Sequence, residues 1–110
     1  MLPFAQVNDQ TFQQEVFQSA LPVLVEFGAE WCVPCKRMEP VLAELANQWQ
    51  GRVRLAKLDV DESIQVTVRY QVMSVPTLIL FIRGEESLRL VGLQSHQRIL
   101  EKVSAKIAGN

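Results

Sequence analysis

The stretch that decides the fold runs from residue 23 to residue 35, VLVEFGAEWCVPC. Val23 to Phe27 is a compact run of mostly apolar residues, typical of a central strand that is covered on both faces. Trp31-Cys32-Val33-Pro34-Cys35 follows and contains both cysteines of the chain, and a helical pattern begins directly after it. Two residues separate the cysteines, so they can face each other across one helical turn and form a reversible disulfide.

Length and composition restrict the class of protein. A chain of 110 residues suits one domain with one core, so we expect residues 1–110 to form a single domain. The 11 basic and 12 acidic residues nearly cancel, which disfavours nucleic acid and membrane partners. The N-terminal residues do not have the pattern of a secretory signal, and no apolar run approaches the roughly 20 residues of a membrane-spanning helix. We therefore expect a cytoplasmic protein. We also expect it to be a monomer.

The cysteine spacing leaves several kinds of site open. In a reducing cytosol, a Cys-x-x-Cys pair is more often catalytic or metal-binding than a permanent structural disulfide. A four-ligand zinc site would need two further ligands, whereas the chain has no third cysteine and only one histidine, His96. We therefore expect neither a metal nor a cofactor, and an inert disulfide fits a cytosolic protein poorly.

Hydrophobic periodicity predicts the remaining elements. Apolar residues at intervals of three and four predict an amphipathic helix from Pro34 to about Gln48, with Pro40 inside it. The other expected elements are a strand at 4–7, a helix from Asn8 or Asp9 to about 20, a strand at 53–59, a short helix within 61–70 capped by Asp61 or Ser63, a hairpin of 77–82 and 88–91 with its turn at 83–85, and a helix from 95 onward.

This order of elements, βαβαβαββα, indicates the α/β class. It predicts a central mixed five-stranded sheet flanked by four helices, with right-handed crossovers and an antiparallel final hairpin. The cysteines then lie where a central strand ends and a helix begins. Open α/β sheets usually place their functional sites at such a position.

Several motifs together make the chain resemble the thioredoxin family. They are Trp31-Cys32-Val33-Pro34-Cys35-Lys36, then Pro40 in the following helix, then Val75-Pro76-Thr77 before a strand, and the likeness extends from about residue 4 to residue 108. The resemblance implies a thioredoxin fold, dithiol–disulfide exchange with protein substrates, and regeneration by a thioredoxin reductase of a type that remains open. It also implies that Pro76 follows a cis peptide bond and faces the disulfide.

Three residues depart from the usual pattern of that family. Val33 stands where the family usually has glycine, Glu26 where it usually has a buried aspartate, and Gly28 where a second tryptophan is common. None of these changes removes a thiol or the cis-proline candidate. We expect each to bear on the reduction potential, the rate or the choice of substrate.

The two cysteines are expected to have different roles. Disulfide exchange requires a thiolate, and Cys32 lies at a helix N-terminus, where unpaired N–H groups and the helix dipole favour negative charge. Cys32 is therefore the expected nucleophile. Cys35, one turn further and more shielded, is expected to resolve the mixed disulfide.

Ionisation of a buried Cys35 thiol would be helped by a nearby base. Glu26, in the preceding strand, is the candidate, and Lys57 on the adjacent strand is expected to pair with it because a buried carboxylate is rarely left alone. The alternative is that Glu26 is an acid at the end of a strand or simply an ion-pair partner of Lys57.

A contact surface for the substrate is expected around the thiols. Trp31 is a candidate because it lies beside the nucleophile, with a core position as the alternative, and Val75 is expected to pair with the substrate main chain as an added strand would. Gly28, Met73 and Gly92 are candidates for the apolar rim around Cys32. The full set of expected substrate-binding residues is Trp31, Val33, Pro34, Val75, Pro76 and Gly92.

The sequence thus predicts a thiol–disulfide oxidoreductase that reduces disulfides in proteins. One alternative is a binding subunit of the same fold whose thiols are incidental. Another is a glutathione-linked enzyme similar to glutaredoxins, which the residues between the cysteines do not favour.

Overall fold

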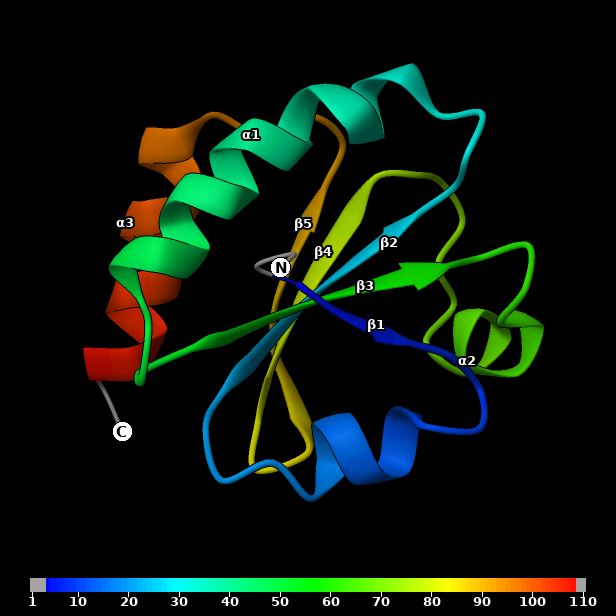
Figure 1. Cartoon of the computed structure of the whole chain (residues 1–110), viewed down its shortest axis with the longest axis horizontal. Coiled ribbons are helices and arrows are strands. Elements are labelled where there is room, and N and C mark those ends of the chain that lie inside the picture. Colours follow the sequence, from blue (N-terminus) through cyan, green and yellow to red (C-terminus); the bar gives the residue numbers. More distant parts are fainter. Residues whose placement is uncertain (1–3, 109–110) are drawn as a thin grey trace.

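The computed structural model describes residues 4–108, and it confirms the predicted order of strands and helices (Figure 1). The elements are β1 (Ala5–Val7), η1 (Gln13–Phe17), β2 (Val23–Gly28), α1 (Val33–Gln48), β3 (Arg54–Asp59), α2 (Ile64–Arg69), β4 (Thr77–Ile82), β5 (Glu85–Val91) and α3 (His96–Ala108). No helix within residues 4–108 is long and apolar enough to cross a membrane.

The five strands form one mixed sheet in the order β1-β3-β2-β4-β5. β3 pairs in parallel with both β1 and β2, while β4 pairs antiparallel with β2 and β5. All six residues of β2 and all six of β4 are buried, as the apolar runs predict for strands covered on both faces. β2 therefore delivers its C-terminal end, and the cysteines beyond it, to the middle of the sheet.

Helices cover both faces of the sheet (Figure 1). α1 and α3 lie on one face, where Met38, Leu42 and Ile99 are fully buried against Leu24 and Leu78. η1 and α2 lie on the other, where four aromatic rings cluster at centroid distances of 5.1 to 6.5 Å; they belong to Phe12, Phe17, Tyr70 and Phe81. The sheet is thus packed on both faces, and α1 begins shortly after its central strand β2 ends.

The helices η1 and α2 differ from the sequence prediction, η1 in its extent and α2 in the residue that caps it. The predicted helix from residue 8 or 9 to about 20 is replaced by turns and the short π-helix η1, with the Asn8 side chain accepting bonds from two backbone N–H groups. Asp9 caps α2 instead, because its carboxylate accepts the N–H groups of Gln65 and Val66 at 3.2 and 2.9 Å. The expected capping of α2 by Asp61 or Ser63 is therefore wrong; Ser63 occupies the capping position but makes no side-chain cap bond.

The final hairpin has a tighter turn than the sequence predicts. Glu85 pairs with Ile82, so β5 begins three residues earlier than expected and only Arg83 and Gly84 form the turn. Both have positive φ, 53° and 79°. Two-residue hairpin turns of this kind match the right-handed twist of the flanking strands, which explains the longer pairing.

Candidate active site

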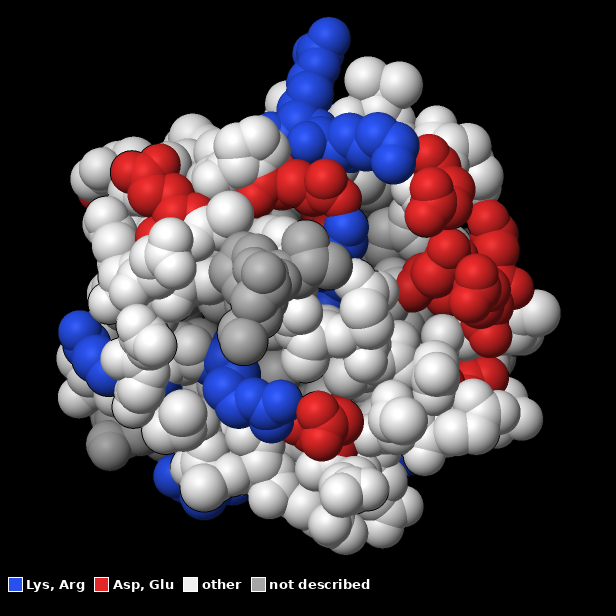
Figure 2. Space-filling view, in the orientation of Figure 1, with Lys and Arg blue, Asp and Glu red and all other residues white. Residues whose placement is uncertain are grey.

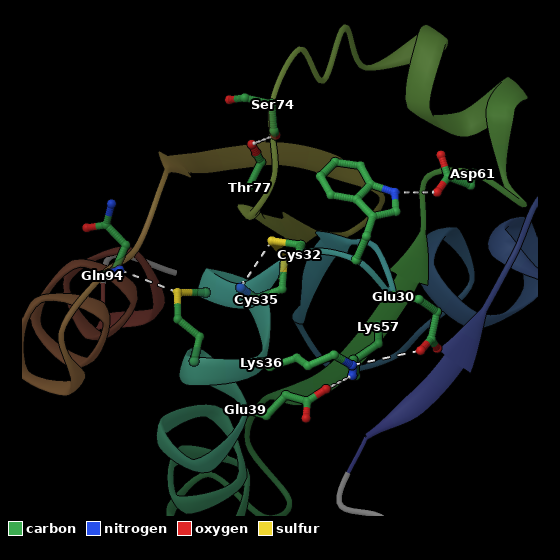
Figure 3. Close-up of a disulfide and its surroundings, with 12 residues drawn as sticks. Glu30, Cys32, Cys35, Lys36, Glu39, Lys57, Asp61, Ser74, Thr77 and Gln94 are labelled. Atoms are coloured by element: carbon green, nitrogen blue, oxygen red, sulfur yellow. Dashed lines mark hydrogen bonds and ion pairs between the residues drawn. A yellow bond between two sulfur atoms is a disulfide. The ribbon is translucent and has the colours of Figure 1, made fainter.

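The two cysteines lie where β2 ends and α1 begins, joined by a disulfide (Figure 3). Their Cα atoms are 5.3 Å apart. Cys32 is the N-cap residue of α1 with extended backbone, and its Sγ accepts a hydrogen bond from the Cys35 N–H at 3.1 Å. The sulfur of Cys32 thus receives one of the N–H groups that a helix leaves unpaired at its start.

The expected difference in exposure between the two cysteines is not seen in this oxidised state. Cys32 is 3% exposed and Cys35 is 5% exposed. The disulfide joins the two sulfur atoms, and burial alone does not distinguish the two residues. The position of Cys32 at the helix N-terminus, where negative charge is favoured, distinguishes it from Cys35.

The expected cis bond between Val75 and Pro76 is confirmed. Ser74 and Thr77, which flank this dipeptide, lie around the disulfide (Figure 3). The N–H of Gly92 donates to the Pro76 carbonyl oxygen at 2.8 Å, and the φ of Gly92 is +88°, a conformation that favours glycine. Gly92 therefore borders the cis-proline segment, as the rim role requires.

Trp31 lies on the surface, with 67% of its area exposed, so the alternative of a core position is wrong. Its indole Nε1–H donates to Asp61 Oδ2 at 2.8 Å, which fixes one edge of the ring. β3 ends at Asp59, Asp61 and Glu62 follow it, and Figure 2 shows acidic side chains gathered on this side of the molecule. Val33 and Pro34 are also exposed beside the disulfide. These side chains are accessible to a large substrate.

Glu26 is almost fully buried in β2, with 1% of its area exposed. Neither of its carboxylate oxygens has a hydrogen-bond partner within residues 4–108. Burial raises the pKa of Glu26 from 4.5 to about 7; the charge of Lys57 lowers this pKa and that of Glu39 raises it. The interpretation of Glu26 as an acid at a solvated strand end is therefore wrong, and the carboxyl group can exchange a proton near neutral pH.

Lys57 does not form the expected ion pair with Glu26. The two residues are opposite each other in the register of β2 and β3, but the Lys57 ammonium binds the Glu39 carboxylate (Figure 3). Glu39 lies on α1, four residues after Cys35, and this spacing puts both on one face of the helix. Glu39 was missed because it occupies a polar position in the amphipathic pattern, although its spacing from Cys35 was available as a signal.

The comparisons with known proteins decide the family. The thioredoxin family model matches residues 3–105. The chain belongs to the thioredoxin family. A thioredoxin of Rickettsia felis is 39% identical over 92% of this chain and 96% of its own length. Thioredoxin 1 of a Nostoc species is 46% identical over 80% of this chain and 82% of its own.

A third relative joins two activities in one chain. The bifunctional thioredoxin reductase/thioredoxin of Mycobacterium leprae is 41% identical over 90% of this chain, which corresponds to 22% of that longer protein. Membership of the thioredoxin family also confirms the thioredoxin fold. It makes this chain a thiol–disulfide oxidoreductase, with Cys32 and Cys35 placed together as a redox-active pair.

The Gly28 position departs from the thioredoxin pattern in a way that shapes the site. A Cβ placed on Gly28 would be 3.2 Å from Cys35 Sγ and 3.8 Å from the carboxyl carbon of Glu26. The structure thus places Gly28 against Cys35, whereas the sequence suggested the rim around Cys32. A cavity of about 120 Å³ adjoins this point and is lined by residues that include Glu26, Gly28, Cys35, Glu39 and Lys57. The missing side chain leaves Glu26 and Cys35 facing the same space, which is polar and has room for several waters.

Proposed function

We propose that this thioredoxin-family chain reduces disulfides in proteins, with Cys32 as the nucleophile and Cys35 as the resolving thiol. The Cys32 thiolate attacks one sulfur of the substrate disulfide, forms a mixed disulfide and releases the first substrate thiolate. The Cys35 thiolate then attacks Cys32 Sγ and releases the second. The substrate gains two electrons and the chain is left with the Cys32–Cys35 disulfide.

The position of Cys32 carries the assignment of the nucleophile. Its sulfur accepts the N–H of Cys35 at the start of α1, and the same bond and the helix dipole stabilise a thiolate there. Cys35 lies within the first turn of the helix and adjoins the cavity that Glu26 also lines. This geometry supports attack by Cys32 followed by resolution by Cys35.

Glu26 is the proposed base for the second step. Its carboxylate takes the proton of the Cys35 thiol as that thiol attacks, and it returns the proton when the disulfide is reduced again. A pKa of about 7 suits both directions, because the carboxyl group is then partly ionised at neutral pH. Lys57 contributes to this balance through its charge.

Substrate binding is assigned to the surface around Trp31, Val33 and Pro34, together with the segment of Val75, Pro76 and Gly92. Val75 lies two residues before β4, and the ladders that pair β4 with β2 and β5 begin at Thr77. Its main chain is therefore positioned to pair with an extended substrate segment, which would give affinity without demanding a particular substrate sequence.

The proposed cycle is closed by a thioredoxin reductase that reduces the Cys32–Cys35 disulfide. The relative of Mycobacterium leprae, named for both reductase and thioredoxin, supports this type of partner. We place the reaction in the cytoplasm, where a supply of reductant keeps thiols reduced, and propose that residues 1–110 act as one monomeric thioredoxin domain.

The test is the reduction of insulin disulfides by dithiothreitol, followed as turbidity. We expect the parent chain to accelerate the reaction and the Cys32→Ser variant to give no acceleration over dithiothreitol alone. An inactive parent whose Cys32→Ser/Cys35→Ser variant still captures a partner protein would instead support the binding-subunit function. Turnover that requires glutathione would support the glutaredoxin-like function.

A further inference from the structure

The charged groups around Glu26 form ion pairs with one another and not with Glu26. Besides Glu26, the charged residues that line the cavity are Glu30, Lys36, Glu39, Lys57 and Asp59, and Cys35 lines it as well. Each lysine binds a carboxylate other than Glu26: Lys57 binds Glu39, and Lys36 Nζ lies 3.8 Å from Glu30 Oε2. Glu26, the most deeply buried acid of the group, has no hydrogen-bonded partner for either carboxylate oxygen within residues 4–108.

The strand register makes this arrangement unexpected. Glu26 and Lys57 are direct neighbours on parallel strands, and a buried carboxylate next to a lysine normally forms an ion pair. Glu39 supplies the competing carboxylate from α1. It is only partly buried, so it pays a smaller desolvation cost than Glu26 when it ionises. The competition for Lys57 thus favours Glu39.

We propose that Glu39 is a positioning residue that binds the Lys57 ammonium and thereby keeps Lys57 from forming a hydrogen-bonded ion pair with Glu26. The catalytic significance of this arrangement rests on the proposed role of Glu26 as the base for Cys35. A Glu26 paired with Lys57 would be held as a carboxylate hydrogen-bonded to an ammonium, and it would accept the thiol proton less readily. Without that ion pair, Glu26 keeps a raised proton affinity, because the effect of burial outweighs the lowering effect of the Lys57 charge.

The direct test is a titration of Glu26 in the oxidised protein, read from the carboxyl ¹³C chemical shift of labelled glutamate. We expect Glu39→Gln to lower the pKa of Glu26 by about one pH unit, because Lys57 is released to pair with it and a nearby negative charge is removed. The matched control is Glu44→Gln, which removes an exposed carboxylate from the same helix and is expected to leave the Glu26 titration unchanged.

The same Glu39→Gln change made in a Lys57→Gln chain separates two causes of the pKa shift. One is the release of Lys57 to pair with Glu26, and the other is the loss of repulsion between two carboxylates. In a Lys57→Gln chain there is no ammonium to release, so we expect Glu39→Gln to shift the Glu26 titration by less than about half as much as in the parent background. An equal shift in the two backgrounds, or no shift in the parent, would overturn the proposal.

The rate of mixed-disulfide resolution distinguishes this proposal from the catalytic role of Glu26. We expect the midpoint of its pH profile to move to lower pH in Glu39→Gln together with the titration of Glu26. If the titration moves and the rate profile does not, Glu39 is confirmed as the positioning residue and Glu26 is removed from the mechanism.

Discussion

Glu26 and Lys57 are opposite each other on β2 and β3, yet Lys57 binds Glu39 and both oxygens of Glu26 lack a hydrogen-bond partner within residues 4–108. An ionised carboxylate in such a place is unfavourable, so the chain stabilises the protonated form of Glu26. The protonation state of Glu26 therefore affects two properties. The protonated form stabilises the fold, and the ionised form is the proposed acceptor of the Cys35 thiol proton.

The first consequence is that the folded state loses stability as pH rises. Folding raises the pKa of Glu26 from 4.5 to about 7, so the folded chain holds a proton that the unfolded chain releases in this range. The stabilisation is complete below pH 4.5 and is lost as pH rises through 7. At 1.36 kcal/mol per pH unit, the contribution of Glu26 is about 3 kcal/mol.

Urea unfolding at pH 5 and pH 8 measures this effect through Glu26→Gln, which stays neutral at both values. We expect the free energy of unfolding of Glu26→Gln, relative to the parent, to be higher at pH 8 than at pH 5 by about 2 to 3 kcal/mol. Glu62→Gln, a change of an exposed carboxylate, is the control and should show no such difference. Equal relative stabilities of Glu26→Gln at the two pH values would contradict the account.

The second consequence concerns the rate at which Cys35 resolves the mixed disulfide. In the parent, this rate should rise with pH through about 7, because only ionised Glu26 accepts the thiol proton. Glu26→Gln should remove this inflection and slow resolution by about 10²-fold at pH 7, within the usual range for loss of a general base. Single-turnover kinetics with a preformed mixed disulfide on Cys32 measure the step; a parent-like profile in Glu26→Gln would exclude the base role.

Gly28 gives a third prediction. In Gly28→Ala, the new methyl group would lie 3.2 Å from Cys35 Sγ and would occupy part of the space that Cys35 and Glu26 share. We expect slower resolution by Cys35, by about threefold to tenfold if crowding costs about 1 kcal/mol at this step. Initial attack by Cys32 on the substrate is the internal control and should change little. Slowing of both steps alike, or of neither, would contradict a role of Gly28 at Cys35.

Asp9 gives a prediction for the fold. Its carboxylate caps α2 from a turn 56 residues earlier in the sequence, and Asp9→Ala leaves the N–H groups of Gln65 and Val66 without that partner. We expect the free energy of unfolding to fall by about 1 kcal/mol. Asp9→Asn keeps one acceptor oxygen and should retain part of the stability. A loss in Asp9→Asn as large as in Asp9→Ala would show that charge, and not the cap, is responsible.

Much of the fold could be predicted because its patterns are local. The apolar run at Val23–Phe27 predicts a strand covered on both faces, and the spacing of Cys32 and Cys35 at a strand–helix junction predicts the redox pair. The cis bond before Pro76 came from the resemblance to thioredoxins. These features depend on residues that are close in sequence or on a motif that keeps its order.

The parts that could not be predicted depend on contacts across the fold. Asp9 caps α2 because the turn after β1 approaches the start of that helix, and no local signal indicates this approach. Lys57 binds Glu39 and not Glu26 because of the way α1 packs on the sheet. The similar burial of Cys32 and Cys35 follows from the disulfide itself. In each case the outcome is decided by packing between elements.

The most direct test of the account is the capture of a mixed disulfide with a protein substrate. Cys35→Ser removes the resolving thiol, so mass spectrometry and peptide mapping should find the substrate joined to Cys32 in a long-lived adduct. Cys32→Ser should form no comparable adduct through Cys35. Efficient capture through Cys35 in Cys32→Ser, or no adduct on Cys32 in Cys35→Ser, would contradict the assignment of Cys32 as the attacking thiol.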